Sequence, residues 1–176
     1  MTTAPKAFTF ETSVTVRSAA PPEVVFDVVS DLRAHLVWGG ERATDETFKL
    51  LDLQTSDETA TVGTTFSSTG ANFNGTFHDR STVSEASRPS RFRIETDSHL
   101  DRKHGRDWDG HWIHRYDIEA DGDGSRIVYT DTLERVNYVP YWLKWWLRPL
   151  TRREIHKADT KQLGNLARLA EERAAG

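Results

Sequence analysis

WIHRYDIEADGDGSRIVYTDTL, residues 112–133, contains the clearest turn in the sequence. Two runs of aromatic and β-branched residues flank Asp121-Gly122-Asp123-Gly124, which predicts a β-hairpin with a four-residue loop. That loop fixes a register with four facing pairs: Ile118 with Ile127, Tyr116 with Tyr129, His114 with Asp131, and Trp112 with Leu133. All eight side chains share one, mainly apolar face, which we expect to point inward. The opposite face carries Asp117, Arg115, Val128 and Thr130 and suits solvent better.

Further strands are predicted on the N-terminal side of this hairpin. Short runs rich in β-branched and aromatic residues lie at 8–17, 48–53, 63–68, 73–83 and 92–96. With the two hairpin strands, 112–118 and 126–133, they make seven. The gaps between consecutive strands are mostly too short for crossover connections, so the sheet is expected to be antiparallel.

Helical patterns occupy two other parts of the chain. After Pro22 the apolar spacing becomes helical, with a break near Asp31 and an end at Gly39-Gly40. After Val139 it is helical to the end, and Pro149 should kink or restart that helix. The core-facing stripe of its later part is Ile155, Leu163, Leu166 and Leu169. Gly164 beside this stripe indicates close packing or a nearby ligand.

Length and composition favour one domain, residues 1–176, in the α+β class. The net charge of -4 argues against nucleic acid as a partner. The chain has no cysteine, which excludes disulfides and thiolate metal sites and fits a reducing compartment. No signal peptide and no transmembrane stretch is visible, so we expect a cytoplasmic protein.

Four short motifs resemble one family in their order and spacing. Pro22-Glu23-Val24-Val25-Phe26, followed by Asp31 and Trp38, is similar to the family's opening helix pattern. Val83 with Pro89 and Phe92 resembles its central strand–turn–strand, and residues 121–130 resemble its Gly-rich hairpin. Residues 166–171, Leu-Ala-Arg-Leu-Ala-Glu, are similar to the end of its last helix. The family is the START-like (helix-grip) superfamily, in its polyketide cyclase/dehydrase and lipid-transport branch.

This resemblance covers nearly the whole chain and implies a fold. In that fold a curved seven-stranded antiparallel sheet wraps around a long C-terminal helix, and two short helices follow the first strand. A cavity between sheet and helix binds lipids, polyketides or other small apolar molecules, and a minority of members catalyse cyclisation or dehydration. The chain departs from the family at Gly39-Gly40, where Asn-Pro is common, and in the unusually polar connection from Ser98 to His111.

Aromatic residues on the predicted inner surfaces are candidates for contacting a ligand, because pockets for small organic molecules are mainly apolar. With two from the C-terminal segment, the candidates are Trp38, Phe66, Phe73, Phe77, Phe92, Trp112, Tyr116, Tyr129, Trp142 and Trp145. The alternative is that some of them fill a closed core.

His114 and Asp131 are the best candidates for catalysis, with Asp79 turned inward by the parity of its strand. A carboxylate can orient an imidazole and raise its proton affinity, which is what acid–base chemistry on a polyketide requires. The tyrosines beside them can stabilise an enolate. The alternative is a cross-strand polar pair that holds two strands in register.

Residues 141–148, Tyr-Trp-Leu-Lys-Trp-Trp-Leu-Arg, combine tryptophan with basic residues. On a helix, Tyr141, Trp142 and Trp145 would share one side, and Lys144 and Arg148 another. Such a segment can pack against the sheet, cover the cavity as a lid, or contact a membrane surface through Trp142, Trp145 and Trp146.

Six residues of the polar connection are potential metal ligands: His99, Asp101, His104, Asp107, Asp109 and His111. Their spacing matches no closed structural site, so we interpret this connection as a solvated loop and predict neither metal nor cofactor. The favoured function is binding of a small hydrophobic molecule. The alternatives are a polyketide cyclase or dehydratase using His114 and Asp131, and a lipid-transfer module that docks on membranes.

Overall fold

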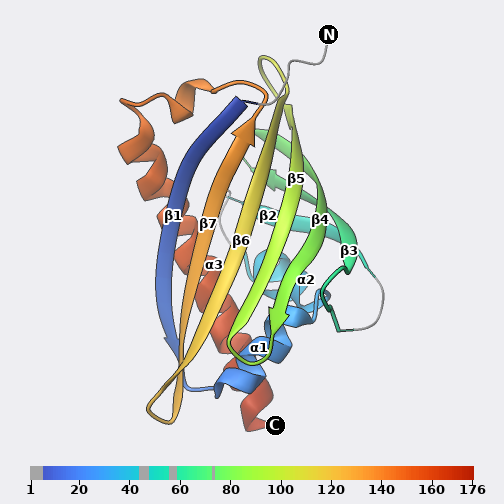
Figure 1. Ribbon diagram of the computed structural model, residues 1–176, viewed down its shortest axis with the longest axis vertical. Helices are drawn as coiled ribbons and strands as arrows, with labels where there is room; N and C mark the ends of the chain where they lie inside the picture. Colours follow the sequence, from blue (N-terminus) through green and yellow to red (C-terminus); the bar gives the residue numbers. More distant parts are fainter. Residues whose placement is uncertain (1–5, 44–47, 56–58, 73) are drawn as a thin grey trace.

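The computed structural model describes residues 6–43, 48–55, 59–72 and 74–176 and has the predicted α+β class (Figure 1). It contains one antiparallel sheet of seven strands in the order β1-β7-β6-β5-β4-β3-β2. The strands are β1 (Lys6–Ser18), β2 (Lys49–Gln54), β3 (Thr65–Asn72), β4 (Gly75–Ser87), β5 (Arg91–Arg102), β6 (Trp108–Asp121) and β7 (Gly124–Val136). Each strand from β2 to β6 pairs with the next strand in sequence, and β1 pairs with β7 at one edge of the sheet.

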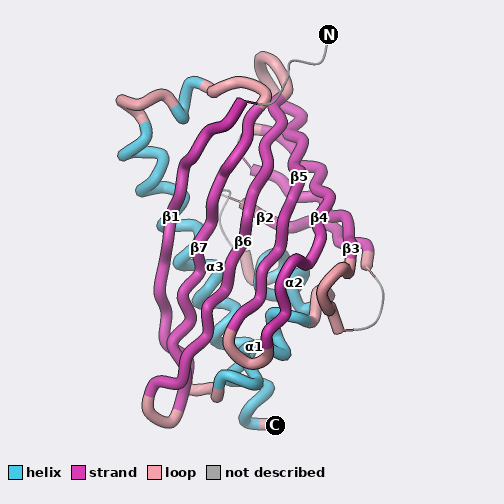
Figure 2. Tube along the Cα trace, in the orientation of Figure 1, coloured by secondary structure: helices cyan, strands magenta, loops and turns pink. Residues whose placement is uncertain are grey.

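The helices lie on one side of this sheet (Figure 2). They are α1 (Pro22–Ser30), α2 (Ala34–Leu36), the π-helical turn η1 (Val37–Glu41), the 3₁₀ turn η2 (Tyr141–Leu143) and α3 (Arg148–Ala175). Figure 1 shows α3 running along the sheet, with α1 near its C-terminal end. This is the predicted helix-grip arrangement. The Gly39-Gly40 pair lies inside η1 and does not end the helical segment.

The central hairpin has the predicted register. All four facing pairs are present, from Trp112 with Leu133 to Ile118 with Ile127. The loop is shorter than predicted, because Asp121 and Gly124 pair with each other and leave only Gly122 and Asp123 between the strands. Gly122 has φ +64°, a conformation that glycine adopts without steric cost.

Contrary to expectation, Thr130 on the opposite face of the hairpin is buried rather than exposed to solvent. Its strand β7 lies between β1 and β6, and Ser13 of β1 places its Oγ 3.3 Å from Thr130 Oγ1. Flanking strands therefore bury this outer position.

The polar connection from Ser98 to His111 is mostly strand, contrary to the sequence interpretation. β5 continues to Arg102 and β6 begins at Trp108, so only residues 103–107 connect them. Leu100 and Trp108 are each 1% exposed and alternate with polar neighbours on the outer face. Because one face is buried and the other solvated, the segment is a half-buried hairpin.

The prediction of a helix through residues 141–148 is wrong. η2 is a single turn, and α3 begins only at Arg148, with Pro149 in its first turn, where a missing N–H breaks no helical hydrogen bond. The expected restart at Pro149 is confirmed. Tyr141, Trp142 and Trp145 were predicted to lie on one side of a continuous helix. Because that helix does not form, this prediction is also wrong.

Two apolar clusters lie between the sheet and α3. The Trp108 cluster includes Phe10, Leu100, Leu133 and Leu143, with Ile155 of α3 packed against it. The Phe92 cluster is larger. It includes buried residues of α1, of β1 and of β4–β7, together with Leu163, Leu166 and Leu169 of α3. The predicted stripe of α3 therefore contacts both clusters.

Candidate ligand-binding cavity

A cavity of about 730 Å³ lies between the two clusters, among β2–β7, η1 and α3. Its aromatic lining consists of His35, Trp38, Phe48, Phe66, Phe77, Trp108, Trp112, His114, Tyr116, Tyr129 and Trp142. The volume is within the range of about 300–1,000 Å³ that small-molecule pockets occupy. A drug-sized organic molecule can therefore be enclosed here.

Seven of the ten predicted ligand-contacting residues line this cavity: Trp38, Phe66, Phe77, Trp112, Tyr116, Tyr129 and Trp142. Phe92 lies in the closed core, edge-on to Phe26 at 6.0 Å between ring centroids. Trp145 is 77% exposed and does not line the cavity. Phe73 is outside the described residues.

A band of polar side chains crosses the concave face between the two apolar clusters. The band takes one or two residues from each of β1, β4, β5, β6, β7 and α3. Within each element, these residues have apolar neighbours on both sides. We call this band the polar belt: Thr12, Asp79, Ser81, Thr96, Ser98, His114, Asp131 and Asp159. All of them except Thr12 line the cavity.

His114 and Asp131 are at the centre of the polar belt. His114 Nδ1 lies 2.9 Å from Asp131 Oδ1 and 2.8 Å from Tyr129 Oη. The imidazole is parallel to the Tyr129 ring, with 6.3 Å between centroids and 4° between planes. Nε2 forms no hydrogen bond with the described residues, so it is free to meet a ligand. The predicted pair is thus formed inside the cavity.

Asp159 of α3 adds a second carboxylate to this centre. Thr12 Oγ1 donates a hydrogen bond of 3.2 Å to Asp159 Oδ2. Burial raises the pKa of Asp159 to about 8, and the charge of Asp131 acts in the same direction. Near neutral pH, Asp159 is therefore largely protonated and can donate a hydrogen bond.

The electrostatic state of the neighbouring groups follows from burial and these carboxylates. Burial alone lowers the pKa of His114, but the charge and hydrogen bond of Asp131, with the charge of Asp79, outweigh it, so the pKa is raised. Burial raises the pKa of both Tyr116 and Tyr129, which keeps their hydroxyls protonated. The cavity thus places an imidazole whose proton affinity is raised next to several O–H donors.

Asp79, the third predicted catalytic residue, lies further along the polar belt. It faces Ser98 across β4 and β5, and a hydrogen bond from Ser98 lowers its pKa, while burial has the larger effect and raises it. Next to them, Ser81 and Thr96 are paired through their hydroxyls at 2.9 Å. This part of the belt is a set of small hydroxyl groups around one carboxyl.

Sequence reasoning missed several of the polar cavity residues. Asp159 could have been found, because it lies four residues from both Ile155 and Leu163, within an apolar helical stripe. His35 had no comparable signal. It is buried against Trp38, its Nε2 is 2.7 Å from the Val29 carbonyl oxygen, and burial lowers its pKa to about 4.

The opening of the cavity is at the N-terminal end of α3. Leu150 lines the cavity and is nevertheless 57% exposed, and Glu154 one turn later is also exposed. Trp142 forms the wall beside them, while Trp145 and Trp146 point outward. The aromatic segment is therefore next to the opening.

The chain belongs to the family described as polyketide cyclase / dehydrase and lipid transport, whose model matches residues 9–171. The match spans all of the sheet except the first three residues of β1, together with most of α3. No curated protein matches the sequence.

Solved structures share the fold at low identity. An uncharacterised protein from Rhizobium leguminosarum has a TM-score of 0.66 at 17% identity, over 97% of this chain and 99% of that one. The protein TTHA0849 from Thermus thermophilus has a TM-score of 0.64 at 17% identity, over 94% and 99%. DynU16, from the dynemicin biosynthetic locus, has a TM-score of 0.55 at 15% identity, over 92% of this chain and 47% of that one.

Within the described part of the chain, every helix is too short or too polar to cross a lipid bilayer.

Proposed function

We propose that this protein binds a small, mainly apolar organic molecule in the cavity and holds a polar group of that molecule at the polar belt. The observation that carries the proposal is a cavity of about 730 Å³ with aromatic walls and a His–Asp centre. A buried imidazole and two carboxyl groups cost free energy unless they gain partners. A hydroxyl or carbonyl of a ligand can supply such a partner at His114 Nε2.

A fluorescence titration with N-phenyl-1-naphthylamine, a neutral probe that brightens in apolar surroundings, tests this function. Ala158→Phe fills the cavity from α3, and Lys157→Phe places the same ring on the exposed side of the helix. The wild type and Lys157→Phe should bind alike, and Ala158→Phe should bind at least about tenfold more weakly, a loss of about 1.4 kcal/mol. Equal binding by all three proteins, or none by the wild type, would contradict the proposal.

A second candidate function is acid–base catalysis of a cyclisation or dehydration, as some proteins of this family perform. The specific observation in its favour is the convergence of His114, Asp131 and two tyrosine hydroxyls on one cavity. Deprotonated His114 would take a proton from the carbon beside a ketone, while a tyrosine O–H stabilises the resulting enolate oxygen. The enolate carbon then attacks a second carbonyl, and the alkoxide regains the proton.

Exchange of the methyl protons of acetophenone in D₂O, followed by proton NMR, isolates the first step. We expect the wild type to exceed the buffer rate and His114→Gln to lose about 10²-fold of that excess, the usual contribution of a general base. His104→Gln, on the exposed β5–β6 connection, is the matched control. Exchange at the buffer rate in the wild type would remove the catalytic assignment and leave the binding function intact.

We also propose that the ligand enters from an anionic membrane surface. Tyr141, Trp145 and Trp146 are 65%, 77% and 49% exposed and lie beside the cavity opening. Lys144 lies among them, 5.4 Å from the Tyr141 ring centroid and 5.3 Å from that of Trp146. Exposed indole rings with adjacent cations are typical of segments that rest at lipid headgroups.

A further inference from the structure

The outer face of the sheet carries a cluster of imidazoles and carboxylates, on the side opposite the cavity. His78 of β4 pairs directly with His99 of β5, and His99 pairs in turn with Asp109 of β6. Asp101 lies two residues after His99, and therefore on the same face of β5. His78, His99 and Asp109 line a groove of about 790 Å³ on the outer face.

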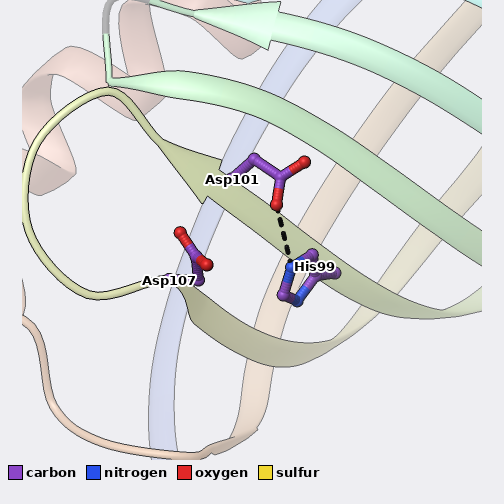
Figure 3. Close-up of side chains that lie close together, drawn as sticks. All are labelled: His99, Asp101 and Asp107. Carbon is purple, nitrogen blue, oxygen red and sulfur yellow. Dashed lines mark hydrogen bonds and ion pairs between the residues drawn. The ribbon is translucent and has the colours of Figure 1, made fainter.

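The carboxylate of Asp101 lies close to both imidazoles. Both Nε2 atoms are near the same carboxylate, at 3.1 Å from His78 to Asp101 Oδ2 and 3.0 Å from His99 to Asp101 Oδ1. Asp107 also belongs to the cluster, since its carboxylate lies within 4.8 Å of ligand atoms of His99 and Asp101 (Figure 3). Ligand atoms around a tetrahedral zinc ion are about 3.4 Å apart, so small movements would accommodate the ion.

Hydrogen bonds behind the cluster orient its members. Asp109 Oδ1 lies 2.6 Å from His99 Nδ1, and Asn137 Nδ2 donates to the other oxygen of Asp109 at 2.7 Å. A carboxylate that accepts from Nδ1 of a histidine and leaves Nε2 for the metal is a regular feature of zinc sites. The backbone N–H of Arg102 fixes Asp107 in the same way, at 3.1 Å.

We propose that His78, His99 and Asp101 bind a zinc ion, with Asp107 as the fourth ligand and Asp109 as the residue that positions His99. Neutral imidazole and carboxylate are suitable ligands for zinc. The ion would bridge β4, β5 and the β5–β6 connection, about which the sequence alone indicated only a solvated loop. His78 completes the set, because strand pairing brings it to His99 across 21 positions of sequence.

Protons are the competing occupant of this site. The carboxylates of Asp109 and Asp101 raise the pKa of His99, with Asp109 contributing most, and a protonated His99 would bridge the two as an ion pair. Zinc and a proton therefore compete for His99, and zinc binding should weaken as the pH falls. The two occupants are distinguished by stoichiometric metal uptake.

Isothermal titration of the full chain with zinc chloride at pH 7.5 tests the proposal. We expect one zinc ion per chain, with binding more than about 100-fold weaker in His78→Ala and His99→Ala and about 10–100-fold weaker in Asp109→Asn. His104→Ala and His156→Ala remove exposed histidines outside the cluster and should leave binding unchanged. Zinc affinity that is absent in the wild type, or that falls equally in the control variants, would overturn the site.

Cobalt(II) absorption provides a second readout that does not depend on affinity. Cobalt bound to the wild type should show the intense visible bands of a tetrahedral complex, and His78→Ala should lose them while its circular dichroism stays native. Weak octahedral bands in the wild type would contradict a four-ligand protein site. Because no member of this cluster belongs to the polar belt, failure here leaves the proposed ligand-binding function untouched.

Discussion

Asp159 is a carboxyl group in surroundings that oppose its ionisation. It is contributed by the middle of α3, and its direct hydrogen-bond donor is the hydroxyl of Thr12. The charge of Asp131 lies nearby, so a second negative charge in the cavity is costly. The raised pKa of Asp159 therefore links the protonation of the cavity to the stability of the whole fold.

Replacing Asp159 with asparagine should change how stability depends on pH. The folded-state pKa of about 8 lies above the unfolded value of about 3.9, so Asp159 favours folding below pH 4 and this contribution is lost as pH rises towards 8. We expect the difference in unfolding free energy, Asp159→Asn minus wild type, to increase by up to about 1.4 kcal/mol per pH unit in that window. Urea denaturation at pH 5, 6.5 and 8 measures it. A constant difference would contradict the raised pKa.

Local geometry decided which polar residues of the cavity could be predicted. The hairpin turn fixed the pairing of His114 with Asp131, because side-chain parity follows directly from a short loop. Asp159 joins them through the packing of α3 on the sheet, 28 residues from Asp131, and no local rule specifies that contact. Asp79 was predicted to turn inward from strand parity, but its distance from His114 depends on how the sheet curves.

Gly164 lies within α3 at a position where an added methyl group would meet no steric obstacle. A Cβ built at this position meets no heavy atom within 4 Å, so the close packing considered from the sequence is absent. Gly164→Ala should raise the free energy of unfolding by about 0.5–1 kcal/mol, because alanine costs less conformational entropy in a helix. Gly110→Ala should have the opposite effect, since its Cβ would lie 2.2 Å from the Trp108 ring. Denaturant unfolding of both variants checks the pair, and a destabilised Gly164→Ala would contradict it.

The proposed contact with membranes can be tested at Trp145 and Trp146, which lie between η2 and α3. In flotation with vesicles containing phosphatidylserine at low salt, the wild type should rise with the vesicles. The double variant Trp145→Ala and Trp146→Ala should bind about tenfold more weakly, because two rings leave the headgroup region. Leu51→Ala removes an apolar side chain elsewhere that is 53% exposed, close to the 49% of Trp146, and this variant should float like the wild type. Identical flotation of all three proteins would rule out docking through this segment.

Elements were predictable where burial alternated along the chain. The alternation of apolar residues predicted that β1, β6 and β7 exist. It did not predict where β5 ends and β6 begins, because the outer faces of these two strands are polar there. Leu100 and Trp108 were the only sign that the two strands continue, and each is a single apolar residue among charged or polar neighbours. Residues 141–148 were misassigned because their apolar spacing is compatible with a helix, although only a single 3₁₀ turn forms before the helix starts at Arg148.

Ligand binding should stabilise the whole molecule, because the cavity walls come from nearly every strand and from α3. With N-phenyl-1-naphthylamine at about 100 times its Kd, linkage predicts about 2.7 kcal/mol of added stability, or about 5–10 °C in Tm for a chain of this size. Differential scanning calorimetry measures the shift. Lys157→Phe should show it in full and Ala158→Phe should show little of it. A Tm that does not move for the wild type would indicate that the probe does not bind inside.

The position of the polar belt selects among ligand shapes. Apolar walls extend on both sides of it, towards Trp108 at one end and towards Phe66 and Ile94 at the other. A fatty acid carries its only polar group at one tip, so a tip placed at the belt would leave half of the chamber without hydrocarbon. A compact ring system with an oxygen near its midpoint would occupy both halves and still reach His114. If the proposed function holds, we therefore expect the chamber to distinguish molecules by where along their length they are polar, rather than by their overall hydrophobicity.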